Sequence, residues 1–137
     1  MAKLRHIAIS TKDAEGTARF YREAFDMEEV GRAGPSDFGF GIYLSDGTIN
    51  LAILDLTNAK FDQLGKGLDY VGLHHFGVVV EDRAEMRQKL DGMEVPCILE
   101  APEHPAAGEF FEVKFRGPDG VVFDISEHPW VGAAGID

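Results

Sequence analysis

The stretch Gly72-Leu73-His74-His75-Phe76-Gly77-Val78-Val79-Val80-Glu81-Asp82 decides the fold, because the chain begins with a similar pattern. That earlier pattern reads Leu4-Arg5-His6-Ile7-Ala8-Ile9-Ser10-Thr11-Lys12-Asp13. One constant shift places His6 on His75 and Asp13 on Asp82. Self-similarity of this kind indicates a duplicated structural unit. We therefore expect two copies of one unit, each opening with a strand that carries a histidine able to bind a metal.

The first copy predicts a strand, a helix and three more strands. Residues 3–10 alternate, so that Ile7 and Ile9 lie on one face of a strand and His6 lies on the other. A cap at Thr11 or Asp13 precedes a helix over residues 14–25. The next strands are expected near 26–31 and over 38–44 and 48–54. The first unit therefore spans residues 3–55.

The second copy repeats this order after residues 56–71, which lose regular periodicity and form a connection. The second unit spans residues 72–127. A strand around His75 leads to a helix over 81–90 and to strands over 95–100, 109–116 and 121–126. The tail, 128–137, carries the only tryptophan, Trp130, and we expect its end to be poorly ordered or to dock on a partner subunit. Both units belong to a single domain of residues 1–137.

Composition narrows the class of protein. The 137 residues are 45% hydrophobic, which is enough for one compact core. The 13 Lys and Arg residues against 24 Asp and Glu residues leave a formal charge of -11, which argues against nucleic acid and anionic membranes as partners. Without a leading charged-then-apolar segment or an apolar run of spanning length, we expect a cytoplasmic protein. The single cysteine, Cys97, is expected to be a buried structural thiol.

An acid in the last strand completes a candidate metal site. Asp124 lies among Val122, Phe123 and Ile125, and a buried carboxylate requires a cationic partner. Together, His6, His75 and Asp124 are a suitable set of ligands for a divalent metal. In the alternative interpretation the histidines form hydrogen bonds in a polar cleft, while Asp124 pairs with Lys114 or Arg116. Their matching places in a duplicated unit favour the metal.

The strand at 109–116 alternates, so that Glu112, Lys114 and Arg116 share one face. Our hypothesis is that Lys114 or Arg116 holds an anionic group of a substrate, and that Glu112 acts as a base or orients the lysine. The alternative is a solvated edge strand with a ladder of ion pairs. His74 directly precedes His75, and neighbouring side chains of a strand point to opposite faces. We therefore expect His74 on the face opposite His75, with a structural role.

The chain resembles the vicinal oxygen chelate superfamily in two features. It has two tandem strand-helix-strand-strand-strand units, each starting with a His-apolar-small-apolar strand. It also has the turn Pro118-Asp119-Gly120 shortly before an acid. This superfamily includes glyoxalase I, extradiol dioxygenases and bleomycin-resistance proteins. The resemblance covers residues 3–127. It implies an α+β fold in which two tandem βαβββ units form an incomplete mixed β-barrel with the helices outside. It also implies a homodimer, a small-molecule substrate, and metal ligands at His6, His75 and Asp124, the last where the family usually has Glu.

Two departures from the resemblance shape the predicted function. Many family members take a fourth ligand from the last strand of the first unit, but Asn50, Leu51 and Ala52 stand there. Lys114 stands at the place of the acid–base tyrosine of extradiol enzymes. A 2-His-1-Asp site for an Fe, Ni, Zn, Mn or Co ion remains, and it suits a bidentate oxygen substrate.

The predicted function is a metal-dependent lyase, isomerase or dioxygenase. The candidate catalytic residues are Glu112 and Lys114, and the candidate substrate-binding residues are Asn50, Arg116 and Tyr43. The alternative is a metal-free protein of the bleomycin-resistance type that sequesters a ligand in the same cleft.

Overall fold

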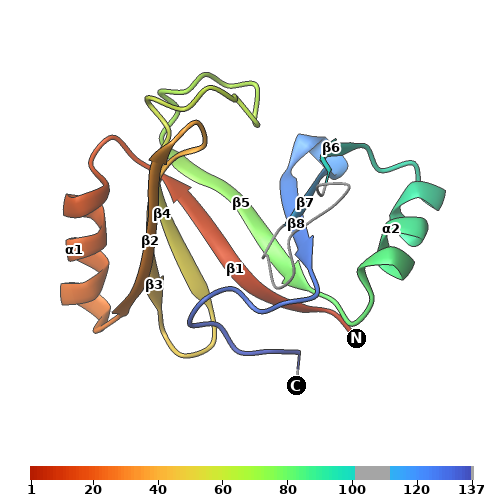
Figure 1. Ribbon diagram of the computed structural model, residues 1–137, viewed down its shortest axis with the longest axis horizontal. Helices are drawn as coiled ribbons and strands as arrows, with labels where there is room; N and C mark the ends of the chain where they lie inside the picture. Colours follow the sequence, from red (N-terminus) through yellow and green to blue (C-terminus); the bar gives the residue numbers. More distant parts are fainter. Residues whose placement is uncertain (101–111, 137) are drawn as a thin grey trace.

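The computed structural model describes residues 1–100 and 112–136, which form two α-helices and one eight-stranded sheet (Figure 1). The elements of the first half are β1 (Lys3–Ser10), α1 (Ala14–Phe25), β2 (Glu28–Ser36), β3 (Gly39–Ser45) and β4 (Asn50–Asp55). Those of the second half are β5 (Gly72–Val79), α2 (Arg83–Gly92), β6 (Cys97–Leu99), β7 (Val113–Arg116) and β8 (Val122–Ser126), with a short 3-10 turn at Pro118–Gly120. The predicted α+β class is confirmed, and the sheet is not closed into a barrel.

The order of the strands places the two opening strands at the centre of the sheet. Across the sheet the order is β2-β3-β4-β1-β5-β8-β7-β6. β1 and β5 are antiparallel to each other, and each is parallel to the last strand of its own unit, β4 and β8 respectively. The repeated histidines therefore come from neighbouring strands, although they are far apart in the sequence.

Each helix covers its own half of the sheet, on the outside (Figure 1). In both units an aspartate caps the helix: Asp13 accepts a hydrogen bond from the Gly16 backbone at 2.9 Å, and Asp82 accepts one from the Glu85 backbone at 3.0 Å. Neither described helix is long and apolar enough to cross a membrane. The repeated caps explain why the two halves fold alike at this point.

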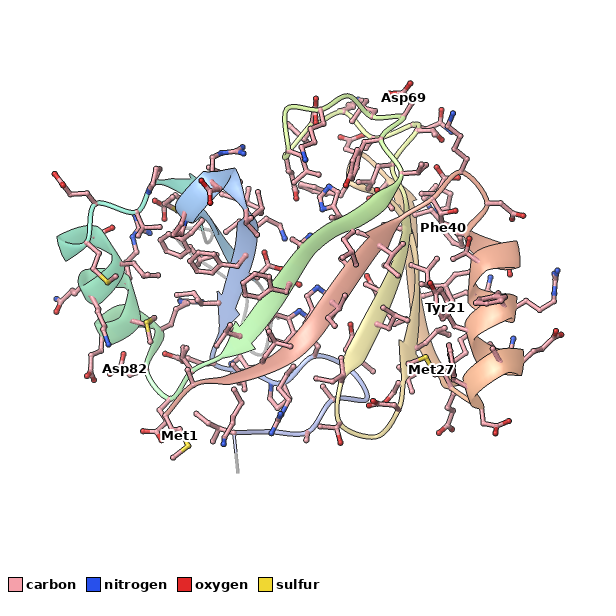
Figure 2. All side chains as sticks on the ribbon, turned by 180° about the vertical axis from the view of Figure 1, so that it is seen from behind. Met1, Tyr21, Met27, Phe40, Asp69 and Asp82 are labelled. Atoms are coloured by element: carbon pink, nitrogen blue, oxygen red, sulfur yellow. The ribbon has the colours of Figure 1, made fainter. Side chains whose placement is uncertain are left out.

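The apolar core is divided between the two helices. Ala14 and Ala18 of α1 pack on β3 and β4, and Tyr21 and Met27 lie at the edge of this cluster (Figure 2). The second cluster joins β7 and β8 to α2: the buried side chains are Val113, Phe115 and Ile125, and partly buried residues that include Met86 and Leu90 of α2 pack against them. Since the helices take up one face of the sheet, polar side chains can gather on the other face.

The tail folds back on its own chain over residues 128–136, so the prediction of poor order is wrong there, while docking on a partner subunit stays a prediction. The Gly135 carbonyl accepts a hydrogen bond from Arg5 Nε at 3.1 Å. The Gly132 carbonyl accepts one from Ser45 Oγ at 2.6 Å. Trp130 is buried, with 5% of its surface exposed. These contacts hold the tail across β1, β3 and β4 (Figure 1).

Candidate metal centre

The site is one row of residues that crosses five neighbouring strands. In the register of the sheet Asn50 of β4 pairs with His6 of β1, and His6 pairs with Gly77 of β5. Gly77 pairs in turn with Asp124 of β8, which pairs with Lys114 of β7. Directly paired residues point to the same face of a sheet. The topology therefore gathers these polar groups, and His75, two residues from Gly77, joins them.

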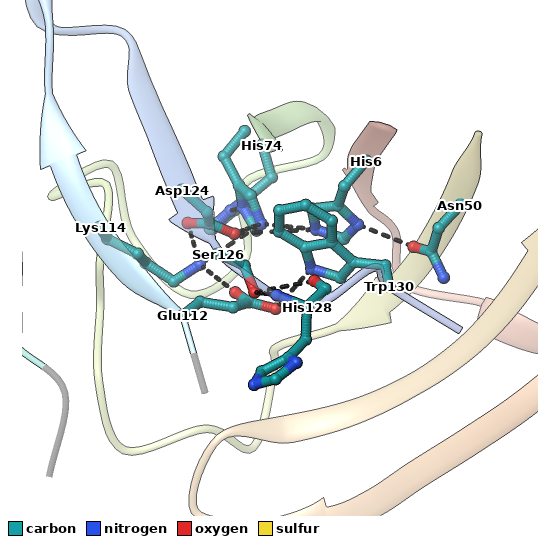
Figure 3. Close-up of polar contacts among 10 residues, drawn as sticks. His6, Asn50, His74, Glu112, Lys114, Asp124, Ser126, His128 and Trp130 are labelled. Carbon is teal, nitrogen blue, oxygen red and sulfur yellow. Dashed lines mark hydrogen bonds and ion pairs between the residues drawn. The ribbon is translucent and has the colours of Figure 1, made fainter. Parts of the chain in front are cut away.

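Three ligand atoms converge at the centre of this row (Figure 3). His6 Nε2 lies 3.1 Å from His75 Nε2, and Asp124 Oδ2 lies 3.0 Å from His75 Nε2 and 3.8 Å from His6 Nε2. Metal–ligand bonds of about 2.0–2.2 Å place neighbouring ligand atoms roughly 3 to 3.5 Å apart. Glu112 is close enough to supply a fourth ligand, since one atom from each of the four residues lies within 4.8 Å of the others. The spacing fits a divalent metal ion.

Asp124 Oδ2 is the atom that most needs a cation. The carboxylate is fully buried, and its Oδ1 accepts a hydrogen bond from Lys114 Nζ at 2.6 Å. Oδ2 accepts no hydrogen bond among the described residues, although it faces both imidazoles. A buried carboxylate oxygen without a donor is costly. A metal ion between Oδ2 and the two Nε2 atoms would remove that cost.

Asn50 fixes which nitrogen of His6 is available. Its Nδ2 donates to the Val131 carbonyl at 2.9 Å, so its Oδ1 faces His6 Nδ1 at 2.7 Å. An amide oxygen only accepts, so the Nδ1–H of His6 donates to it and the lone pair lies on Nε2. This is the common support for a metal-binding histidine. Both the oxygen and the nitrogen of the Asn50 amide already have hydrogen-bond partners in the protein. Asn50 is therefore better placed to position His6 than to make the predicted contact with a substrate.

The prediction that His74 lies on the face opposite His75 is wrong. The register between β1 and β5 slips between Ala8 and Ile9, which pair with His75 and Leu73. His74 is therefore the extra residue of a β-bulge, where the alternation of side chains breaks down. Its Nδ1 lies 2.7 Å from His75 Nδ1, and both histidines are buried. His74 thus holds the ring of His75 in place through Nδ1.

Trp130 belongs to the site, and sequence reasoning missed it. Its ring stacks on His6 with centroids 4.7 Å apart and 2° between the planes. Its Nε1 donates to Glu112 Oε1 at 2.8 Å (Figure 3). The space for this ring exists because Gly77 has no side chain: a Cβ there would lie 2.7 Å from the indole. The one signal in the sequence was that Trp130 is the only tryptophan of the chain. No spacing in the sequence linked Trp130 to His6.

Lys114 lies in the centre of the site, as hypothesised, but its partners are protein carboxylates. Its Nζ is 3.1 Å from Glu112 Oε2 and 3.4 Å from His75 Nε2, in addition to the contact with Asp124. Burial acts to lower the pKa of Lys114, but Asp124 and Glu112 outweigh it and raise the pKa above its usual value. The ammonium therefore stays charged. Asp124 pairs with Lys114, as the alternative interpretation expected, and this pair lies within the cluster of possible metal ligands.

A cavity of about 460 Å³ opens beside these groups. Its polar end is formed by His6, His75, Glu112 and Lys114. Its walls are apolar and aromatic, and they include Phe38, Tyr43, Leu54, Phe61 and Leu99. The volume is in the range of small-molecule sites. The cavity can therefore present a small, largely apolar compound to the convergent ligand atoms.

The other candidate residues divide between this cavity and another part of the molecule. Tyr43, one of the candidate substrate-binding residues, lines the cavity. Arg116 instead donates to the Gln63 carbonyl at 3.1 Å and lines a second cavity with Leu73 and Val121. The structure brings His6, His75, Asp124, Glu112 and Lys114 together but not Arg116. Residues 101–111, at the start of the predicted strand 109–116, lie outside the described residues.

Comparison with known proteins shows the family of the chain. Residues 3–125 match the model of the Glyoxalase/Bleomycin resistance protein/Dioxygenase superfamily. The chain belongs to this superfamily. The resemblance to vicinal oxygen chelate proteins is thereby confirmed. No curated protein matches the sequence of this superfamily member.

Solved structures share the fold of this glyoxalase-superfamily chain at low sequence identity. A hypothetical protein from Bacillus halodurans C-125 is 24% identical, with a TM-score of 0.72, over 94% of this chain and 96% of that one. A Streptomyces coelicolor methylmalonyl-CoA epimerase variant with 2-nitronate-propionyl-CoA is 20% identical, with a TM-score of 0.72, over 90% of this chain and 94% of that one. A methylmalonyl-CoA epimerase with methylmalonyl-CoA and NH4+ is 18% identical, with a TM-score of 0.75, over 98% of this chain and 99% of that one.

The three histidines of this glyoxalase-superfamily site make stability depend on pH. Burial, with repulsion from His75, lowers the pKa of His6 from 6.5 to about 4. Burial lowers the pKa of His74 and of His75 to about 3. In the unfolded chain these groups regain a pKa of about 6.5, so unfolding takes up protons between about pH 3 and 6.5. The stabilisation is complete above that window and is lost as the pH falls through it.

We therefore expect the metal-free protein to lose roughly 2 kcal/mol or more of unfolding free energy between about pH 7.5 and pH 5. Urea unfolding in the presence of a chelator at the two pH values measures the difference. Equal stability at both values would show that the histidines are not held neutral in the folded protein.

Proposed function

We propose that the chain is a metal-dependent enzyme in which His6, His75 and Asp124 hold a divalent ion. The observation that carries the proposal is Asp124 Oδ2, buried without a hydrogen bond and facing two imidazole nitrogens. The low pKa values of His6 and His75 keep both imidazoles neutral, which is the form that binds metals. A bound ion would act as a Lewis acid toward two neighbouring oxygens of the substrate.

Glu112 is the proposed base. Its two carboxylate oxygens are oriented by Trp130 Nε1 at 2.8 Å and Lys114 Nζ at 3.1 Å. Its side chain is 23% exposed and lines the cavity, so it can reach a bound molecule. A carboxylate held in this way can accept a proton from a carbon next to a carbonyl group. Trp130 and Lys114 thus act as positioning residues for Glu112.

The walls of the cavity support a small substrate with an apolar body. Phe38 and Phe61 stack with centroids 5.3 Å apart, and Leu54 and Leu99 continue the apolar surface. We propose a compound with two neighbouring oxygens at its polar end. The epimerases among the structural neighbours are isomerases, so of the three predicted reaction types, isomerase, lyase and dioxygenase, isomerisation by proton transfer is the first to test. A cytoplasmic homodimer remains part of the proposal, to be tested by light scattering and cell fractionation.

Metal binding tests the proposal directly. We expect protein purified anaerobically to bind one Fe, Ni, Zn, Mn or Co ion per chain. Replacing His6 with alanine should weaken binding by about 100-fold or more, because even the loss of a supporting group outside the ligand shell costs 10- to 100-fold. His128→Ala is the matched control, since this histidine is exposed and lines neither of the two cavities described above.

Elemental analysis and calorimetric titration of the three proteins measure this prediction. A wild-type chain that neither retains a divalent ion nor takes one up would remove the metal-dependent function.

A metal-free binding protein is the second candidate, and Lys114 favours it. The ammonium of Lys114 already compensates the negative charge of Asp124 and Glu112. In that case the cavity sequesters a ligand without a metal. His6→Ala would then leave ligand affinity intact, whereas the enzyme proposal requires that metal and activity are lost together.

A further inference from the structure

Lys114 lies inside the proposed metal site and contacts three of its four possible ligand residues. It is 4% exposed, and its Nζ lies 2.6 Å from Asp124 Oδ1, 3.1 Å from Glu112 Oε2 and 3.4 Å from His75 Nε2. The contact with Asp124 is built into the fold, because the two residues are paired in the register of β7 and β8. The proposed metal and the ammonium must therefore share one carboxylate.

The charges of the site show what this sharing does. Asp124 and Glu112 contribute two negative charges, and Lys114 contributes one positive charge. Without the lysine, the two carboxylates would face each other in a largely buried site, with no other lysine or arginine of the described residues paired with them. Such burial of unpaired charge is strongly unfavourable. The ammonium therefore stabilises the metal-free state.

The same charge opposes a divalent ion. Two like charges a few ångströms apart repel strongly in a site shielded from water. Lys114 leaves Asp124 Oδ2 free to face the imidazoles, since it occupies only Oδ1. The lysine thus allows an ion to bind but lowers the affinity of the site for it.

We propose that Lys114 is a built-in cation that keeps the metal-free site folded and weakens the binding of the divalent ion, so that the metal can be taken up and released. This inference rests on the proposed function of the site. It adds that the affinity for metal is set by a lysine of the chain as well as by the ligands.

Two substitutions separate the charge of Lys114 from its hydrogen bond. Lys114→Gln removes the charge and keeps a donor for Asp124, while Lys114→Met removes both. Lys60→Met is the matched control for the loss of a positive charge, because Lys60 is 71% exposed and pairs with Asp37 on the surface. The probes are Ni²⁺ and Mn²⁺, with affinity measured by calorimetry and thermal unfolding measured with and without a chelator.

We expect Lys114→Gln to bind Ni²⁺ at least tenfold more tightly than the wild-type chain, and Lys60→Met to bind as the wild type does. With the chelator, both Lys114 variants should unfold at a lower temperature than the wild type, and Ni²⁺ should raise their unfolding temperature by more. If Lys114→Met does not fold without metal, Lys114→Gln still decides the question.

Each outcome points to one conclusion. If the wild type binds the ions and Lys114→Gln binds them no more tightly, Lys114 does not oppose the metal and this inference is wrong. If the wild type binds Ni²⁺ or Mn²⁺ and Lys114→Gln binds the same ion at least tenfold more tightly, the inference is supported. If none of the proteins binds either ion, the proposed metal-dependent function itself fails.

Discussion

Replacing Asp124 with asparagine is expected to lower the unfolding free energy of the metal-free protein by about 3 kcal/mol and to abolish metal binding. Asp124 is fully buried, and its Oδ1 receives the shortest hydrogen bond of Lys114, at 2.6 Å. Asparagine has nearly the same shape, so the cavity is not enlarged. It leaves the buried ammonium with Glu112 as its remaining carboxylate partner among the described residues. The loss therefore measures charge and not packing.

Urea unfolding with a chelator measures the stability, and titration with Ni²⁺ measures the binding. Asp37→Asn is the matched control, because Asp37 pairs with Lys60 on the surface, where both side chains are mostly exposed. Exposed pairs contribute about 0–1 kcal/mol. A value for Asp124→Asn as small as that of the control would show that the pair with Lys114 does not support the fold.

Replacing Gly77 with alanine should displace Trp130 from His6. A Cβ at this position would lie 2.7 Å from two carbons of the indole ring and 2.9 Å from His6 Cβ. These distances are too short for any real contact, and the ring cannot bend. Overpacking of this kind costs about 1–3 kcal/mol. We expect that loss of stability, together with a red shift of tryptophan fluorescence as the buried ring becomes exposed.

Trp130 is the only tryptophan of the chain, so its fluorescence reports on this contact alone. Gly92→Ala is the control, since Gly92 is in helix α2 and a Cβ there would meet nothing within 4 Å. That variant should be at least as stable as the wild type. Unchanged fluorescence and stability in Gly77→Ala would mean that the tail does not lie over His6 in solution.

The sequence repeat predicted more of the site than residue types alone could. His6 and His75 were selected because both occupy the same place in a duplicated unit, and Asp124 because it is an acid in an aliphatic strand. The structure places their ligand atoms 3.0 to 3.8 Å apart. The repeat worked because equivalent strands of two copies meet at the centre of one sheet. Their role as metal ligands stays a prediction until binding is measured.

The sequence by itself determined the order of strands and helices, the two repeated units, a choice between Thr11 and Asp13 as the cap of the first helix, and the main candidate ligands. These features depend on local periodicity and on the duplication, both of which can be read along the chain. Only the tertiary structure decided the partners of those ligands. Asn50 supports His6 because their strands pair. His74 reaches the site because of a β-bulge. Trp130 stacks on His6 because the tail returns across the sheet. Contacts between residues distant in sequence leave no local pattern, so the surroundings of the site could not be read from the sequence alone.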